Sequence, residues 1–148
     1  MGRNKPIRPG QVIRVVIADD QPLQRSGFRM VLESQPDIEV VGEAGDGARL
    51  LAIVRRTETD VVVMDIQMPR VNGLIAAVRV AEDAVIREHQ GKPPRIVLVT
   101  ATELEDHLVQ AAEADVFAVL YKDVQPELLL ETVRAAASAS PVSWLTQR

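Results

Sequence analysis

The sequence contains no cysteine, and aromatic residues make up only 3% of it. Without cysteine, the chain forms no disulfide bonds, no iron–sulfur clusters and no thiolate zinc sites. No apolar run approaches the roughly 20 residues that a membrane-spanning helix needs. The N-terminal residues are basic, but they lack the apolar core of a signal peptide. These absences predict a soluble, cytoplasmic protein.

Positive charge is concentrated at the N-terminus of a chain whose net charge is −4. The first fourteen residues contain no acidic side chain and four basic ones, Arg3, Lys5, Arg8 and Arg14. The acidic remainder argues against broad nucleic-acid binding by this domain itself. We interpret residues 1–11 as a basic, flexible leader, with a partner-binding arm as the alternative.

The chain has 148 residues and is 47% hydrophobic, which suggests one domain with a substantial core. Five apolar runs rich in valine and isoleucine predict β-strands, at residues 12–18, 38–44, 60–65, 95–100 and 116–121. Several of these runs are continuous rather than alternating. That pattern is typical of parallel strands that are covered on both faces.

The segments between these runs have helical periodicity, at residues 22–34, 46–57, 72–90, 102–114 and 125–139. We expect one buried face in the first segment, formed by Leu23, Phe28, Val31 and Leu32. Asn72 is placed to cap the third segment, and Pro126 to occupy the first turn of the last. The alternation of strands and helices predicts an α/β fold, (βα)5, with an open, doubly wound, parallel five-stranded sheet.

Polar side chains are expected at the carboxyl ends of the predicted strands, where open α/β sheets bind their ligands. Asp19 and Asp20 follow the first strand, and Asp65 ends the third. Thr100 ends the fourth strand, and Lys122 follows the fifth. Because the candidates come from four strands of one sheet, we expect them to form a single site.

Three carboxylates at one edge of a sheet provide hard oxygen ligands, which suit Mg²⁺ or Mn²⁺ better than zinc. A lysine and a threonine hydroxyl beside such a cation suit a phosphoryl group. One carboxylate can then serve as the nucleophile that accepts phosphate. We expect water to spare both Asp19 and Asp20 full burial. The alternative for Asp20 is that it only caps the following helix.

Four segments of the chain resemble the receiver domain of two-component response regulators. They read VVIADDQPLQRSGFRMVLE, DVVVMDIQMPRVNGLIA, RIVLVTA and VLYKD, in this order. The similarity covers residues 12–139 and looks like the NarL/FixJ-type subfamily, which carries LuxR-type output domains. It implies a receiver domain over these residues, with the flavodoxin-like strand order 2-1-3-4-5. Residues 140–148 would be a C-terminal tail or the start of a linker.

The resemblance implies a role for each carboxylate. Asp65 would accept a phosphoryl group from a sensor histidine kinase. Asp20 would bind Mg²⁺ directly with help from Asp19, and the backbone carbonyl of Gln67 would complete the metal ligands that the protein supplies.

The same resemblance places Thr100 and Lys122 against the phosphoryl oxygens once the acceptor is modified. Ala101 would leave room beside the phosphate, and Gly73 would let the next helix begin close by. The domain would be a phospho-acceptor with at most weak self-dephosphorylation, not an enzyme.

The chain departs from the family pattern at Val119, where a tyrosine or phenylalanine usually acts with Thr100 as a switch. Strand periodicity places Phe117 and Tyr121 on the same face as Val119. Tyr121 is therefore a candidate to take over part of the switch. The alternative is that Phe117 and Tyr121 are only packing residues.

Two further departures concern length. The span from Asp65 to Thr100 is a few residues longer than the family norm, and residues 84–95 are the predicted site of a neutral extra helix or loop. After residue 139 only nine residues remain, too few for a helix-turn-helix output domain. The chain is thus expected to be an excised receiver or a natural stand-alone one, with any DNA contact in an output domain outside it.

Three functions remain open from the sequence. The first is a phosphorylation-controlled switch that forms a homodimer or releases an output domain. The second is a Mg²⁺-dependent phosphatase, which wants a second aspartate two positions after the nucleophile, whereas Asp19 and Asp20 are adjacent. The third is an atypical receiver that binds a protein or small ligand without phosphorylation. Val119 favours this third function, and the intact Asp65 and Lys122 argue against it.

Overall fold

A parallel β-sheet forms the centre of the computed structural model, which describes residues 11–68, 72–101, 110–111, 113–138 and 145–146. Its strands are β1 (Ile13–Ala18), β2 (Ile38–Ala44), β3 (Val61–Asp65), β4 (Arg95–Thr100), β5 (Ala118–Tyr121) and β6 (Leu145–Thr146). They lie in the order β2-β1-β3-β4-β5-β6, and every neighbouring pair is parallel. The predicted order 2-1-3-4-5 is confirmed. The short strand β6 extends the sheet beyond β5 and was not predicted.

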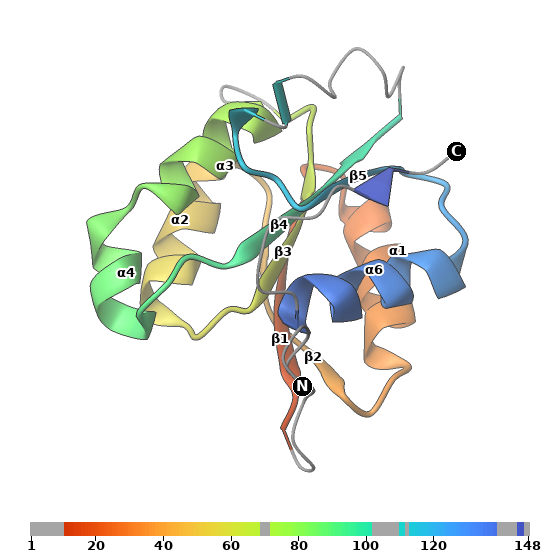
Figure 1. Ribbon diagram of the computed structural model, residues 1–148. Helices are drawn as coiled ribbons and strands as arrows, with labels where there is room; N and C mark the ends of the chain where they lie inside the picture. Colours follow the sequence, from red (N-terminus) through yellow and green to blue (C-terminus); the bar gives the residue numbers. More distant parts are fainter. Residues whose placement is uncertain (1–10, 69–71, 102–109, 112, 139–144, 147–148) are drawn as a thin grey trace.

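Helices cover both faces of the sheet (Figure 1). One face carries α1 (Pro22–Glu33) and α6 (Pro126–Ser138), and the other carries α2 (Gly47–Arg56), α3 (Gly73–Ala81) and α4 (Ala84–Gln90). Crossover helices of this kind are what parallel strands require. The predicted helix at 102–114 lies mostly outside the described residues, although Gln110, Ala111 and Glu113 are helical.

The core consists of two apolar layers, one on each face of the sheet. All five residues of β3 are buried, which is why the four residues before Asp65 are continuously apolar rather than alternating. On one face Val62 and Leu98 pack with Leu50 of α2. On the other face, residues such as Val63 pack with helices α1 and α6. Each buried valine or leucine contributes about 1.5–3 kcal/mol of hydrophobic free energy, so the sheet is a rigid support for its carboxyl edge.

The predicted buried face of α1 is only partly right. Phe28 and Leu32 are buried, but the side chain of Leu23 is 85% exposed. Leu32 lies about two and a half helical turns after Leu23, so the two side chains point to opposite sides of the helix. Leu23 was therefore assigned wrongly to the core.

The single helix predicted at residues 72–90 is two helices. Asp83 accepts a hydrogen bond from the backbone N–H of Ile86 at 2.9 Å and starts α4 after α3 has ended. Gly91, with φ of 88°, closes α4 in the left-handed conformation that glycine adopts readily. A separate helix is thus present within residues 84–95, and its being an addition to the family pattern stays a prediction. Asn72 caps α3 and Pro126 begins α6, as predicted.

Helix α4 is firmly attached to its neighbours. Ile86 is fully buried beneath it, and the guanidinium of Arg55 on α2 contacts the carboxylate of Asp83 at 2.7 Å. The amide of Gln90 accepts a hydrogen bond from the N–H of Thr59 at 3.0 Å and donates one to the carbonyl of Thr59 at 2.9 Å. These contacts make α4 an integral part of the α2–α3 layer.

Candidate functional site

Three carboxylates meet at the carboxyl edge of the sheet. Asp19 follows β1, Asp20 is its neighbour, and Asp65 ends the adjacent strand β3. One oxygen from each lies within 4.8 Å of the others. Asp19 and Asp65 are buried, whereas Asp20 is exposed to solvent. The strand ends therefore bring together the three acids that the sequence singled out as metal ligands.

Lys122 supplies positive charge to this cluster. Its Nζ lies 3.0 Å from Oδ2 of Asp65 and 3.4 Å from Oδ2 of Asp19, and its side chain is only 11% exposed. The backbone N–H of Lys122 donates to the carbonyl of Thr100 at 2.9 Å, which ties the ends of β4 and β5 together. The lysine is thus held in place by the sheet and faces the acids directly.

The pKa of Asp65 is raised above its usual value, chiefly because the carboxyl group is buried. Lys122 and the N–H of Gln67, which donates to Oδ1 at 3.0 Å, act in the opposite direction without cancelling the effect of burial. Nearby Asp19 raises the pKa further. The contacts that the protein makes to the Asp65 carboxylate therefore do not offset the cost of burying its negative charge. Additional positive charge at this site would favour the ionised form.

Burial by itself would lower the pKa of Lys122, but the hydrogen bond from its ammonium to Asp65 and the charge of Asp19 raise the pKa overall. The lysine is thus kept as a cation at neutral pH. One cation facing two buried carboxylates leaves this part of the site short of positive charge.

Asp19 contains a polar atom that no hydrogen bond satisfies within the described part of the chain. Its Oδ1 accepts from the N–H of Gln21 at 2.9 Å, while its buried Oδ2 is only in ion-pair range of Lys122 and has no hydrogen-bond partner. A buried carboxylate oxygen without a partner is costly. A hard divalent cation shared with Asp20 and Asp65 would supply the missing interaction, so these residues fit such an ion.

Two expectations about the acidic pair change. Asp19 is fully buried, so the expectation that water spares both carboxylates full burial is wrong for this residue. Its place directly after the buried strand β1 is the reason. The N-cap of α1 is Gln21, and its side chain makes no capping hydrogen bond. Asp20 does not cap the helix, which removes the alternative reading of that residue.

Gly73 brings the start of α3 against the backbone of Asp65. A Cβ at Gly73 would lie 2.5 Å from the carbonyl oxygen of Asp65 and 2.8 Å from Cα of Ile66, so no larger residue fits without a shift of backbone. The N–H of Gly73 also donates to the carbonyl of Ile66 at 2.6 Å. The close approach expected from the sequence is present.

The residues expected to act as a switch lie on β4 and β5. Thr100 and Val119 are buried, and Tyr121 is half-buried against the same core layer as Val119. Phe117 packs in the opposite layer, so the prediction that it shares a face with Val119 is wrong. Strand β5 begins only at Ala118, and strand alternation therefore does not extend back to Phe117.

Two other predicted residues lie at the edge of the site. Gln67 is exposed and contributes its backbone N–H to Asp65. Ala101 directly follows β4 and is also exposed.

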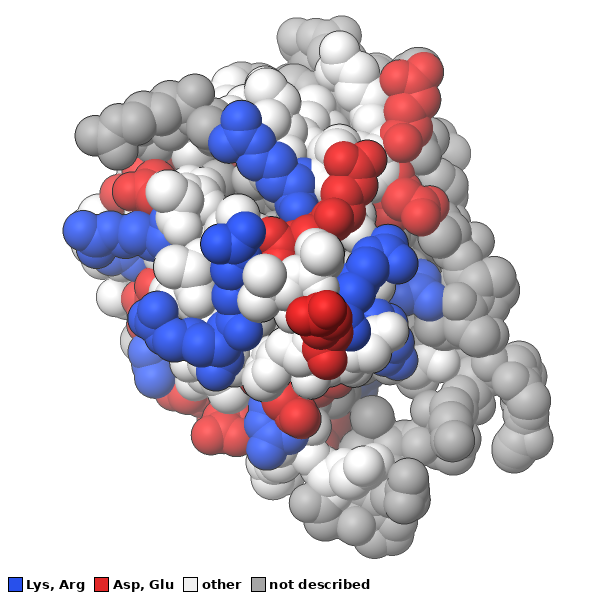
Figure 2. Space-filling view, turned by 90° about the vertical axis from the view of Figure 1, so that its left-hand side faces the viewer, with Lys and Arg blue, Asp and Glu red and all other residues white. Residues whose placement is uncertain are grey.

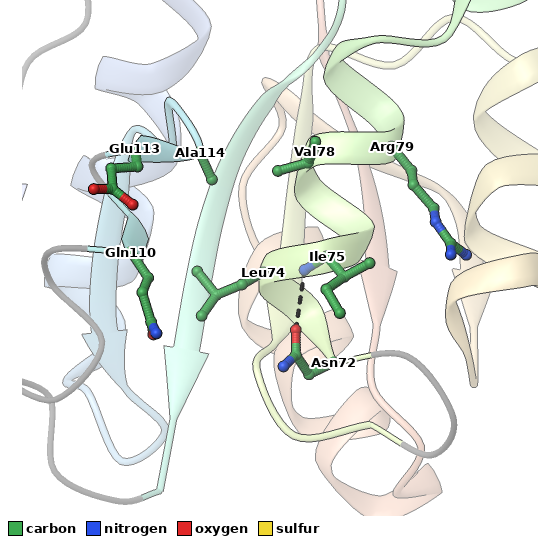
Figure 3. Close-up of a pocket in the computed structure, with 8 residues that line it drawn as sticks. All are labelled: Asn72, Leu74, Ile75, Val78, Arg79, Gln110, Glu113 and Ala114. Atoms are coloured by element: carbon green, nitrogen blue, oxygen red, sulfur yellow. Dashed lines mark hydrogen bonds between the residues drawn. The ribbon is translucent and has the colours of Figure 1, made fainter.

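A separate cavity of about 580 Å³ was not foreseen from the sequence. Its lining residues are Asn72, Leu74, Ile75, Val78, Arg79, Gln110, Glu113 and Ala114. Leu74 and Val78 of α3 point toward Gln110 and Ala114, and Arg79 points to the other side of the helix (Figure 3). Among the described residues that line the cavity, Glu113 is the one carboxylate, and Asp19, Asp20 and Asp65 are not among them.

Charged side chains are intermixed on the face that α2, α3 and α4 cover (Figure 2). Arginines from these helices share the face with acidic residues, and Arg55 is paired with Asp83. Among the described residues of this face, positive and negative side chains thus alternate without forming one continuous positive surface (Figure 2). Within the described residues, no helix is both long enough and apolar enough to cross a membrane.

The family model of the response regulator receiver domain matches residues 15–134. The chain belongs to this family. Its receiver domain is 41% identical over 130 residues to the transcriptional regulatory protein YxjL of Bacillus subtilis, covering 88% of this chain and 56% of the relative. It is 36% identical over 129 residues to the nitrate/nitrite response regulator NarP of Escherichia coli, covering 87% and 57%. The chain thus spans about half the length of these curated relatives, which are of the NarL type expected from the motifs.

Solved structures agree with the fold. The receiver domain aligns with the response regulator domain of Thermotoga maritima CheB with a TM-score of 0.77 and 28% identity, covering 88% of this chain and all of that one. It aligns with a LuxR-family two-component response regulator from Aurantimonas with a TM-score of 0.72 and 29% identity, covering 88% and 90%. The doubly wound α/β fold predicted from the strand and helix pattern, and the receiver fold that the resemblance implied, are both confirmed.

Proposed function

We propose that this receiver domain accepts a phosphoryl group on Asp65 from a phosphohistidine of a sensor histidine kinase, with Mg²⁺ or Mn²⁺ as cofactor. The observation that carries the proposal is the placement of Lys122, 3.0 Å from Asp65, beside three carboxylates that converge within 4.8 Å. A nucleophilic carboxylate, a fixed cation and a set of hard oxygen ligands are the groups that phosphoryl transfer to aspartate requires.

In the proposed reaction, a carboxylate oxygen of Asp65 attacks phosphorus as the bond from phosphorus to the histidine nitrogen breaks. The phosphoryl group moves to Asp65, and the imidazole leaves with the electron pair of the broken bond. Lys122 pairs with the phosphoryl oxygens, and the hydroxyl of Thr100 donates to one of them. Asp19, Asp20 and the backbone carbonyl of Gln67 would hold the cation, which would supply positive charge against the transferred group.

We expect phosphorylation of Asp65 to switch the conformation of the domain, and we do not expect the domain to turn over a substrate. The phosphoryl group adds charge and acceptor oxygens beside Thr100 at the ends of β4 and β5, and so biases a two-state surface there. We propose that this surface controls homodimer formation and a DNA-binding output domain outside this chain. The relative YxjL, which is named as a transcriptional regulatory protein and of which this chain covers 56%, supports that assignment. Hydrolysis of the aspartyl-phosphate by the domain itself would be slow.

A second candidate is an atypical receiver that binds a ligand or protein without phosphorylation. The observations that favour it are the buried Val119 in place of an aromatic switch residue and the cavity beside α3. The volume of that cavity, about 580 Å³, falls within the range of small-molecule sites. The complete set of Asp19, Asp20, Asp65 and Lys122 supports phosphorylation as the first choice.

Incubation with a small-molecule phosphodonor separates the two candidates. Intact-mass analysis of the wild type should show one phosphoryl adduct that depends on Mg²⁺ and disappears with a chelator. Asp65→Asn should abolish the adduct, while Asp60→Asn, which changes an exposed aspartate before the same strand, should retain it. An adduct that persists in Asp65→Asn, or no adduct at any Mg²⁺ concentration, would transfer the assignment to the phosphorylation-independent module.

A further inference from the structure

Asp20 is the member of the acidic site whose own side chain is held least. It is exposed, and within the described residues its carboxylate makes no hydrogen bond or ion pair. Asp19 and Asp65, by contrast, are buried and accept hydrogen bonds from the backbone N–H groups of Gln21 and Gln67. The direction in which the side chain of Asp20 points therefore depends on the backbone that carries it.

The backbone of Asp19 is held on both sides. Its N–H donates to the carbonyl of Ala44, at the end of β2, at 2.9 Å. Its carbonyl accepts a hydrogen bond from Nη1 of Arg25 on α1 at 2.6 Å. A carbonyl group and the N–H that follows it in the chain lie in one rigid plane. Arg25 therefore restrains the peptide group that joins Asp19 to Asp20.

Arg25 is itself oriented by an acidic residue of β2. Its half-buried side chain donates from Nε to Oε1 of Glu43 at 3.2 Å. Arg29, one turn further along α1, donates to the other oxygen of Glu43, and this hydrogen bond is the main reason why the pKa of that carboxyl group is lowered. Glu43 is thus an anion between two arginines, and it directs the guanidinium of Arg25 toward the carbonyl of Asp19.

We propose that Arg25 is a positioning residue of the acidic site, which fixes the peptide between Asp19 and Asp20 and so sets how these two carboxylates face a divalent cation. A guanidinium suits this role because its nitrogen atoms have fixed directions and can bridge two acceptors. Hydrogen bonds behind the metal ligands orient those ligands, and their loss lowers metal affinity by about 10–100-fold. The role toward a cation rests on the proposed function, whereas the restraint on the peptide does not.

Two effects of Arg25 on cation binding have opposite signs. Its positive charge by itself repels a cation at the neighbouring acids, so loss of that charge would tighten binding. Loss of the hydrogen bond to Asp19 would weaken binding, because Asp20 would then adopt several directions and only some of them would face the cation. The direction of the change in Mg²⁺ affinity therefore separates positioning from a general effect of charge.

Calorimetric titration of the full chain with Mg²⁺ measures this direction. Arg25→Gln should weaken Mg²⁺ binding about tenfold. Arg25→Lys should recover part of the loss, because lysine can still donate to the carbonyl of Asp19. Arg29→Gln is the matched control, since it removes a charge and a contact with Glu43 from the same helix without touching Asp19. Its Mg²⁺ affinity should stay within about twofold of the wild type, as expected for an exposed ion pair.

Amide hydrogen exchange in the metal-free protein tests the restraint on the backbone without any cation. In Arg25→Gln, exchange of the N–H groups of Asp19 and Gln21 should accelerate about tenfold relative to those of β3, in line with the loss of about one hydrogen bond. Exchange in the buried strand β3 reports global unfolding and so corrects for a change in overall stability. Arg25→Lys, the milder change, decides the test if Arg25→Gln does not fold.

Each outcome bears on a different step. Mg²⁺ affinity that is unchanged or tighter in Arg25→Gln, or that falls equally in Arg29→Gln, would overturn the positioning of the two carboxylates. Unchanged exchange at Asp19 and Gln21 would overturn the restraint on the peptide. A wild type that binds no Mg²⁺ would overturn the proposed cofactor, and the exchange rates would still decide whether Arg25 holds the backbone of Asp19.

Discussion

Two glycines show how a single methyl group has opposite effects at different places in this receiver domain. Gly73 touches the backbone of Asp65 and Ile66, with no room for a Cβ. Gly27 lies in the middle of α1, and a Cβ built there meets no atom within 4 Å. Close packing at the site requires glycine at position 73. At position 27, glycine only makes the helix less stable than alanine would.

We predict that Gly73→Ala destabilises the protein by about 1–3 kcal/mol, because the added methyl group must displace the backbone that carries Asp65. Gly27→Ala should instead stabilise it by about 0.5–1 kcal/mol, because alanine is the better helix former. Urea unfolding of both variants measures the two effects. Equal changes in the same direction would show that the approach of α3 to Asp65 is not tight.

Sequence alone could predict which residues form the acidic site, but not their individual surroundings. Asp19, Asp20 and Asp65 were found because parallel strands deliver their ends to one edge. Asp19 is fully buried and Asp20 is exposed, and this difference depends on the packing around each side chain. Nothing in the order of two adjacent aspartates specifies it.

At the scale of elements, α4 is a short helix that is held to its neighbours by specific side chains. Its attachment depends on Gln90, whose amide makes two hydrogen bonds with the backbone of Thr59, a residue that is 2% exposed. The acidic site uses no residue of α4. The helix should therefore contribute to stability without changing the chemistry at the strand ends.

We predict that Gln90→Ala lowers the free energy of unfolding by about 1–3 kcal/mol, because buried backbone groups of Thr59 lose their partners. Phosphoryl labelling of Asp65 should be unchanged, because we expect the longer segment between Asp65 and Thr100 to have no effect on function. Gln125→Ala, at an exposed position before α6, should affect neither quantity. Slower labelling in the Gln90 variant at full folding would show instead that α4 is coupled to the site.

The element boundaries that the sequence missed have local causes. The break between α3 and α4 arises because Asp83 caps a new helix inside a continuous helical pattern. The exposure of Leu23 arises because an apolar residue at the start of α1 points away from the sheet. Strand β6 has two residues, too few to produce a recognisable alternation.

At the scale of the whole molecule, the sheet assembles a site from segments that are far apart in the sequence. Strands β1, β3, β4 and β5 each bring one part of it to the same edge, and their buried side chains fix the spacing. The assembly concentrates three carboxylates against one ammonium group. We propose that a divalent cation supplies the missing positive charge at this site and makes Asp65 a phospho-acceptor.

Thermal unfolding during a Mg²⁺ titration tests this claim most directly, because a ligand that binds only the folded state raises the melting temperature as its concentration increases. We predict that the melting temperature of the wild type rises progressively across millimolar Mg²⁺ and that a chelator reverses the rise. The rise should be much smaller in Asp20→Asn, whose exposed side chain can be changed without disturbing the core. A melting temperature that Mg²⁺ leaves unchanged, or that rises equally in Asp20→Asn, would contradict the proposed cation site.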